Sequence, residues 1–244
     1  MISATDILES AERIDGYRAA CAKSEFNATA REGQIYELST IDAAAAASLE
    51  EVLRTIPIFR GCEIAILDKT ADGGMPHTRP PNLICLPESM CKAGPASNEF
   101  TITLIHEAIH VHQRVFPEVW ARALGKAGWT PIAPGKIPAE LRARCRINPD
   151  TMATPFWAWK GRHVPLPLFP KVPRPPSLSG APIEWYDLKT GAVFHEPPAD
   201  FAAITKERGA PIEHPYELYA DRFSRQFLNT HEAILEALDN LNNQ

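Results

Sequence analysis

The chain has 244 residues, with 30 acidic and 25 basic side chains and a formal net charge of −5. Hydrophobic residues form 45% of it, enough for a core that needs no disulfide framework, and its five cysteines show no framework spacing. The sequence has no basic stripe, which argues against a nucleic-acid partner, and no apolar run approaches the roughly 20 residues that cross a bilayer.

The first half of the chain alternates predicted helices and strands. Apolar residues recur at helical spacing over residues 5–22, and the Ala-rich residues 41–53 favour a second helix. Residues 62–69 have the composition of a strand and are followed by a turn signal at residues 71–74. A second strand is expected over residues 82–86. Two prolines at its start favour an edge strand, because proline cannot donate to a ladder.

The second half contains the strongest predicted helix, over residues 98–115, followed by a short helical turn over residues 118–126. Residues 128–210 differ in character because they are rich in proline and contain Trp157, Trp159 and Trp185 alongside the prolines. Dense proline forbids a helix, and the apolar content favours an ordered insert of strands and loops packed on the core. Two helices follow, over residues 214–228 and from Thr230 onward.

The strongest chemical signal is His106-Glu107-Ala108-Ile109-His110 in the middle of the predicted helix. Two histidines four residues apart leave the same face of a helix and can bind one Zn²⁺. Glu107 then lies beside the metal, where a carboxylate can act as general base towards a water that zinc has acidified. His112 is turned about 200° around the helix from His110, so we do not expect it to bind the same metal.

A second HEAI segment, at residues 231–234, serves as an internal control. Leu235 stands where the second histidine of the motif would be, so this copy cannot chelate a metal. We expect His231 to be a solvated residue near a helix start.

A catalytic zinc needs a third protein ligand and an open fourth position. Gln113 and Phe116 replace the glycine and histidine of the HExxHxxGxxH arrangement, so the third ligand must lie elsewhere. Glu217 is the preferred candidate. Asp221, four residues later on the same helix face, is expected to orient a ligand histidine. The fallback ligands are Glu213, His214 and Asp221.

These residues resemble the gluzincin group of zinc metallopeptidases, which carry HExxH on one helix and ExxxD on a later one. The string MPHTRPPNLICLPE followed by TLIHEAIHVHQR is also similar to small zincin-like proteins of about this size. The resemblance covers residues 62–117 and 211–228, with a longer gap between the two motifs than in the best-known gluzincins. It implies that Glu107 is the base, that His106, His110 and Glu217 bind zinc, and that Asp221 orients a histidine.

The resemblance also assigns residues around the metal. In zincins an edge strand pairs with an extended substrate, and residues 82–86 would be that strand, with His77 near its entrance. His77 could bind substrate or stabilise an oxyanion, and an ordinary loop position is the alternative. Tyr216 and Tyr219 could donate to an oxyanion, with core packing as the alternative.

The expected fold is α+β and zincin-like, with a small mixed sheet packed on the HExxH helix and on a C-terminal helix that bears Glu217. A single domain of residues 1–244 is expected. Its parts are the N-terminal helices (1–60), the edge strand and HExxH helix (61–127), the Pro- and Trp-rich insert (128–210) and the C-terminal helices (211–244).

The preferred function is a zinc-dependent, metallopeptidase-like hydrolase with one Zn²⁺ per chain, acting on a peptide or a small-molecule amide. The alternatives are a zincin-fold hydrolase, lyase or cyclase acting on a small molecule, and a non-catalytic zinc-binding protein. Neither a membrane nor a nucleic acid is expected as a partner. The polar N-terminus lacks the pattern of a signal peptide, so a cytoplasmic protein is expected. Nothing in the sequence indicates an oligomeric state.

Overall fold

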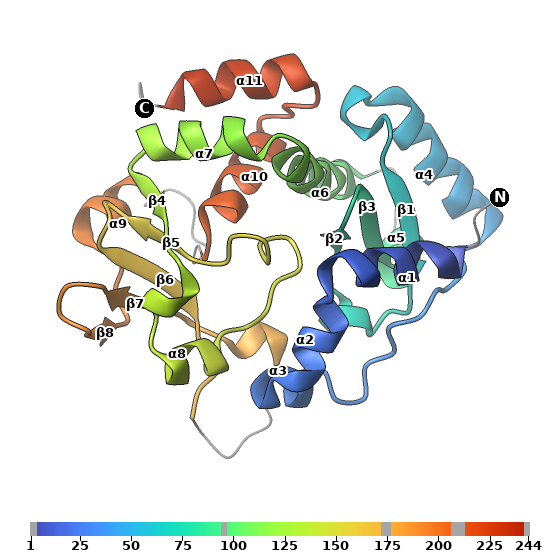
Figure 1. The fold of residues 1–244 in the computed structure, drawn as a ribbon. Coiled ribbons are helices and arrows are strands. Elements are labelled where there is room, and N and C mark those ends of the chain that lie inside the picture. Colours follow the sequence, from blue (N-terminus) through green and yellow to red (C-terminus); the bar gives the residue numbers. More distant parts are fainter. Residues whose placement is uncertain (1–3, 94–96, 172–176, 206–212, 242–244) are drawn as a thin grey trace.

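The computed structural model describes residues 4–93, 97–171, 177–205 and 213–241. The fold is a mixture of helices and two separate β-sheets. Helices α6 (Asn98–Val115) and α10 (Pro215–Arg225) lie between the two sheets (Figure 1). None of the described helices combines the length and the apolar character that crossing a membrane requires.

The N-terminal part contains four helices rather than the predicted two. The bounds are α1 (Ala4–Asp15), α2 (Tyr17–Lys23), α3 (Glu25–Ala30) and α4 (Ala43–Thr55). The single helix predicted over residues 5–22 is wrong because Gly16 adopts a left-handed conformation (φ 59°) and separates α1 from α2. The predicted Ala-rich helix is confirmed as α4, and the Asp42 side chain caps it by accepting from the Ala45 N–H.

The first sheet has three strands, β1 (Glu63–Leu67), β2 (His77–Arg79) and β3 (Leu83–Pro87), in the order β1-β3-β2. β1 pairs with β3 in parallel, whereas β2 pairs with β3 antiparallel, so the sheet is mixed as predicted. The prediction that residues 82–86 form an edge strand is wrong because β3 is the central strand. The two prolines precede β3, in the turn that joins it to β2, so they remove no donor from its ladder.

Both faces of β3 are covered, which explains why its side chains are fully buried. Ile84 and Leu86 join the main hydrophobic core with α6, whereas Leu83 and Cys85 join a second cluster with Ala11 of α1. This alternation follows from the period of two along a strand. β2 is therefore the edge strand that faces the interior of the molecule. The sequence instead predicts a loop around His77.

The insert forms a five-stranded antiparallel sheet in the order β4-β5-β6-β7-β8. Its strands are β4 (Trp129–Pro131), β5 (Trp157–Trp159), β6 (His163–Pro167), β7 (Ile183–Asp187) and β8 (Val193–Phe194), with helices α8 (Ala139–Arg144) and α9 (Ala199–Thr205). Trp129, Trp157, Trp159 and Trp185 belong to the same core cluster as the apolar face of α6. The insert is thus ordered and packed on the core as expected, but it also contains α8 and α9, which the expectation of strands and loops left out.

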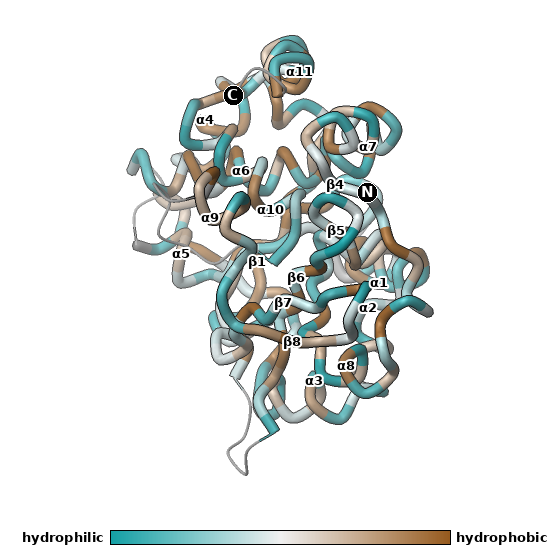
Figure 2. The backbone as a smooth tube through the Cα atoms, turned by 90° about the vertical axis from the view of Figure 1, so that its left-hand side faces the viewer, coloured by the Kyte–Doolittle hydropathy of each residue, from teal (hydrophilic) through white to brown (hydrophobic). Residues whose placement is uncertain are grey.

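The remaining helices enclose the core. They are α5 (Glu88–Ala93), α7 (Pro117–Lys126) and α11 (His231–Asp239), and the short 3₁₀ turns are η1 (Pro57–Phe59), η2 (Ala71–Gly74), η3 (Pro134–Lys136) and η4 (Leu178–Gly180). Figure 2 shows polar and apolar residues mixed along α7 and α11. This pattern suits helices that bury one face, and Trp120 of α7 and Ile234 of α11 are completely buried.

Candidate metal centre

Two neighbouring helices bring three potential metal ligands together. α6 presents His106 and His110, α10 presents Glu217, and the ligand atoms of all three lie within 4.8 Å of one another. His106 Nε2 lies 3.0 Å from His110 Nε2. Glu217 Oε2 lies 3.2 Å from His106 Nε2 and 3.3 Å from His110 Nε2. The three atoms form a nearly equilateral triangle, and the group could hold a metal ion.

Helix geometry and capping account for this convergence. His106 and His110 are four residues apart, which places both imidazoles on one face of α6. α10 begins at Pro215, where the missing N–H costs no helical hydrogen bond, and the His214 ring caps it by accepting from a backbone N–H. Glu217 therefore lies in the first turn of α10, where the helix dipole stabilises a negative charge.

Gln113 determines which nitrogen of His110 faces the other ligands. The Gln113 amide nitrogen donates to the Tyr216 carbonyl (3.0 Å), so its oxygen faces His110 Nδ1 at 2.7 Å. His110 Nδ1 must therefore carry a proton and donate it to Gln113. In a neutral ring this leaves Nε2 with a free lone pair, which is the tautomer a metal ligand needs. The same amide also ties α6 to α10.

Asn148 orients the carboxylate of Glu217. Its amide nitrogen donates to Glu217 Oε1 (2.7 Å) and to Glu213 Oε1 (2.9 Å). Because Oε1 of Glu217 is engaged in this way, Oε2 is the oxygen that faces the two histidines. Each of His110 and Glu217 thus has one atom held by a neighbour and one atom directed to the centre of the triangle.

Glu107 lies beside the triangle and has an unpartnered oxygen. The residue is 3% exposed, and its Oε2 is buried without a hydrogen-bond partner among the described residues. Burial, followed by the nearby charge of Asp150, raises the pKa of Glu107 to about 7. An isolated buried carboxylate is costly, and its presence on a cavity wall marks a candidate for acid–base chemistry.

The charges around the triangle favour a cation at its centre. Burial alone would lower the pKa of His110, but the carboxylates of Glu217 and Asp150 outweigh it and raise the pKa to about 10. Burial would raise the pKa of Glu217, but His110 and His106 hold it well below the usual value. Each imidazole is thus stabilised in its positively charged form, and the same negative surroundings would stabilise a metal ion.

The triangle opens onto a cavity of about 280 Å³. His106, Glu107 and Glu217 form one side of it, and residues 146–150, in the loop between α8 and β5, form another. This cavity gives a bound molecule access to the ligand group and to Glu107.

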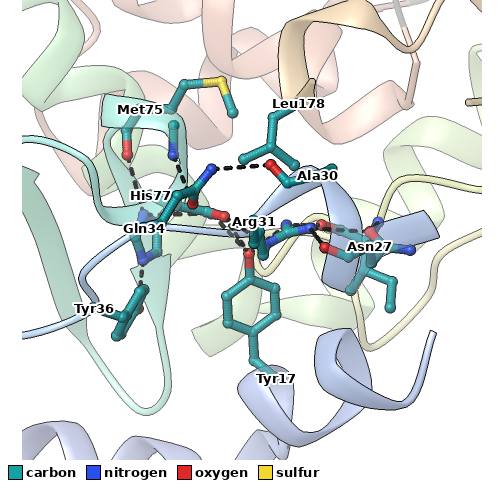
Figure 3. Close-up of polar contacts among 12 residues, drawn as sticks. Tyr17, Asn27, Ala30, Arg31, Gln34, Tyr36, Met75, His77 and Leu178 are labelled. Carbon is teal, nitrogen blue, oxygen red and sulfur yellow. Dashed lines mark hydrogen bonds and ion pairs between the residues drawn. The ribbon is translucent and has the colours of Figure 1, made fainter. Parts of the chain in front are cut away.

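Arg31, Asp72 and His77 line another part of the cavity and belong to a hydrogen-bonded network of buried and partly buried side chains (Figure 3). His77 Nε2 lies 2.6 Å from the Tyr36 hydroxyl. The Tyr17 hydroxyl donates to the Asp72 carboxylate at 2.7 Å, and Arg31 Nε donates to the same carboxylate at 2.9 Å. His77 is therefore on the cavity wall, as the sequence suggested, but in β2 and with its Nε2 engaged by Tyr36.

The other predicted site residues have different roles. Asp221 lines the cavity, but its Oδ1 accepts from Arg225, four residues further along α10, at 2.8 Å. Gln113, and not Asp221, orients His110. Of the fallback ligands, Glu213 pairs with Arg146. His214 is engaged at both ring nitrogens, by the Thr154 carbonyl and by the Tyr216 N–H.

Tyr216 and Tyr219 belong to the hydrophobic core, which was the alternative interpretation of both residues. The Tyr216 ring packs against Trp120 and Trp157, and the Tyr219 ring packs against Phe223. Neither tyrosine is among the described residues that line the cavity. Their place in the core gives no support to an oxyanion role.

Sequence reasoning missed Gln113, Asn148 and Asp150. In the sequence Gln113 stands out only as a departure from the HExxHxxGxxH arrangement, although its position three residues after His110 places it one turn away on the same helix face. Asn148 and Asp150 lie in the stretch Asn-Pro-Asp, whose only sequence signal is that of a turn. No local pattern relates that turn to ligands on α6 and α10.

A search with protein-family models found no match to this chain, and comparisons with curated proteins and with solved structures found none either. The resemblance to gluzincins therefore depends on the motif residues themselves.

Proposed function

We propose that this chain is a zinc-dependent hydrolase of amide bonds, with metallopeptidase-like chemistry and Glu107 as its general base. The observation that carries the proposal is the His106–His110–Glu217 triangle beside the unpartnered carboxylate of Glu107 on a cavity. The metal ligands and the general base are the residues that the HExxH motif and the later glutamate predict.

The dimensions of the triangle fit zinc. Zinc binds imidazole nitrogen and carboxylate oxygen at about 2.0–2.1 Å in a tetrahedron, whose edges are then about 3.3 Å long. The observed edges are 3.0, 3.2 and 3.3 Å. Two neutral imidazoles and one carboxylate are also a usual donor set for a catalytic zinc.

His106, His110 and Glu217 would hold the metal, with Gln113 and Asn148 keeping the His110 ring and the Glu217 carboxylate in position. When bound, zinc supplies a Lewis acid that polarises a carbonyl and lowers the pKa of a coordinated water.

Glu107 carries the proton transfers. Its Oε2 accepts a proton from the attacking water as the new C–O bond forms, and returns it to the leaving nitrogen as the C–N bond breaks. Burial and the neighbouring Asp150 raise its pKa to about 7 in the site without a metal, and a group in this position can both accept and return a proton.

A purely structural metal is the less favoured alternative. Structural zinc sites usually have four protein ligands, whereas the ligand group found among the described residues has three and opens onto a cavity.

The test compares Glu107→Gln with the matched control Glu99→Gln, an exposed residue of the same helix. Zinc content would be measured by elemental analysis, and turnover on the best substrate from a panel of small amides and peptides. Glu107→Gln should keep one zinc per chain and lose turnover by a factor of about 10²–10⁴, the usual contribution of a general base. Glu99→Gln should change neither, and normal turnover in Glu107→Gln would overturn the mechanism.

A further inference from the structure

The edge strand nearest the candidate site is closed to an incoming peptide. β2 is the edge of the three-stranded sheet, and His77 of this strand lies on the cavity wall. His77, Thr78 and Arg79 are 2%, 0% and 0% exposed, respectively. A substrate that paired with this sheet as an additional strand would first have to uncover β2.

The backbone donor that such a strand would use is already occupied. The Thr78 N–H donates to Asp150 Oδ1 at 2.7 Å, and the Thr78 hydroxyl donates to the same oxygen at 2.5 Å. Arg114 Nη2 donates to the Thr78 hydroxyl at 2.8 Å. Strand addition depends on free main-chain groups along an edge, so Asp150 takes the position that a substrate backbone would need.

Asp150 belongs to residues 146–150, which we call the crossing segment. This segment lies in the loop between α8 and β5 that extends from the five-stranded sheet towards β2 (Figure 1). It contacts β2 through Asp150 and α10 through Asn148, which donates to Glu217. The crossing segment therefore joins the two sides of the cavity.

Further contacts hold the crossing segment to α3 and the residue that follows it. The Ile147 N–H donates to Asn27 Oδ1, and Arg31 Nη2 donates to the Ile147 carbonyl, both at 2.9 Å. Arg31 is itself held by Asp72 and by the Tyr17 hydroxyl (Figure 3). A substrate that displaced the segment would break these bonds and leave buried polar groups without partners, which is unfavourable.

The size of the cavity also favours a small substrate. At about 280 Å³ it lies just below the roughly 300–1,000 Å³ of pockets that hold drug-sized molecules. Among the described residues its walls are the metal centre, the crossing segment and the network around His77, so the room lies beside the ligands and not along the buried strand β2.

We propose that the metal centre acts on a compact amide, about the size of a single amino-acid amide, and not on an internal stretch of extended polypeptide. This inference rests on the proposed function and specifies its substrate class. It also departs from the edge-strand recognition that the resemblance to zincins implies.

The experiment measures the binding of two zinc-directed probes to the zinc-loaded full chain by calorimetry. Acetohydroxamic acid is the compact probe, and a tetrapeptidyl hydroxamate is the probe that needs a free strand edge. The compact probe should bind, and the tetrapeptidyl probe should bind more weakly by a factor of about ten or more, equivalent to about 1.4 kcal/mol. Tighter binding of the tetrapeptidyl probe, or no binding of either, would overturn the inference.

A pair of variants tests the part assigned to Asp150. Asp150→Ala removes the acceptor from Thr78, whereas Asp221→Ala removes a carboxylate from the same cavity without touching β2. Asp150→Ala should improve the affinity for the tetrapeptidyl probe relative to the compact one, and Asp221→Ala should leave that ratio unchanged. An unchanged ratio in Asp150→Ala would overturn the assignment of Asp150 as the blocking residue.

The proposed function and the proposed substrate class can be disproved separately. If the wild-type chain binds no zinc, or if Glu107→Gln keeps normal turnover, the proposed function fails whichever probe is preferred. If zinc binds and the tetrapeptidyl probe binds more tightly than the compact probe, only the proposed substrate class is wrong.

Discussion

Two close pairs of histidines occur in the part of the chain that the structure describes, and their comparison shows what makes one of them a candidate metal site. His106 and His110 approach to 3.0 Å between their Nε2 atoms, and His112 Nε2 approaches His231 Nδ1 to 2.9 Å. The second pair includes the first residue of the HEAI segment in α11. Distance between imidazoles therefore does not distinguish the two pairs.

The hydrogen-bond partners of the rings do distinguish them. Gln113 accepts the Nδ1 proton of His110 and leaves Nε2 free to face Glu217. Trp120 Nε1 instead donates to His112 Nδ1 at 3.0 Å, so the neutral His112 ring carries its proton on Nε2 and donates it to His231. In the first pair His110 can present its Nε2 lone pair to a centre shared with His106 and Glu217, whereas in the second pair the His112 nitrogens are engaged by His231 and by Trp120.

Removal of one histidine from each pair should produce the largest difference in zinc affinity between the two pairs. His110→Ala should lose more zinc affinity than the 10–100-fold that removing an outer hydrogen-bond partner usually costs, because it deletes a ligand. His231→Ala should keep one zinc per chain with unchanged affinity, as measured by competition with a chelating dye. Equal losses in both variants would mean that the two pairs do not differ as described.

A smaller effect is expected from the partners of the rings. Gln113→Leu should lower zinc affinity about 10–100-fold because the His110 tautomer is no longer fixed. Trp120→Phe removes the corresponding donor from His112 and should leave zinc affinity unchanged. The same competition assay measures both variants, and an unaffected Gln113→Leu protein would contradict the role given to Gln113.

The smallest predicted effect is on stability and concerns pH. Burial, with the neighbouring His231, lowers the pKa of His112 to about 4, below the roughly 6.5 of an unfolded histidine. As the pH falls, His112 is therefore protonated in the unfolded chain before it is protonated in the folded protein. The stability that neutral His112 contributes is present above about pH 6.5 and is lost as the pH falls towards 4. Between about pH 8 and pH 5.5 the zinc-free wild type should lose roughly 1 kcal/mol more than His112→Gln in urea unfolding. Parallel pH profiles for the two proteins would contradict this.

The ligand helix and its partner could be predicted because their signals are local. The spacing of His106 and His110 defines one helix face, and Glu217 stands in a recognisable helix start after a proline. Folding then had only to bring two amphipathic helices together, which their apolar faces favour.

The rest of the site depends on contacts between distant segments, which no local pattern encodes. Asn148 reaches Glu217 and Asp150 reaches Thr78 from a loop that the sequence describes only as a turn. The two prolines at the entry of residues 82–86 favour an edge strand, but they lie in the turn before β3 and remove no donor from the ladder of this central strand. Local propensity cannot decide strand order, because order depends on which elements cover each face.

The most direct test of the central claim is zinc K-edge X-ray absorption spectroscopy on the full chain loaded with one equivalent of zinc. We predict two imidazole nitrogens and one carboxylate oxygen from the protein at about 2.0–2.2 Å, with a remaining position open to solvent or to a hydroxamate. The spectrum of His110→Ala should lose one imidazole contribution, and that of His231→Ala should match the wild type. Failure to bind zinc, sulfur ligands, or a fourth protein ligand in place of the open position would contradict the account.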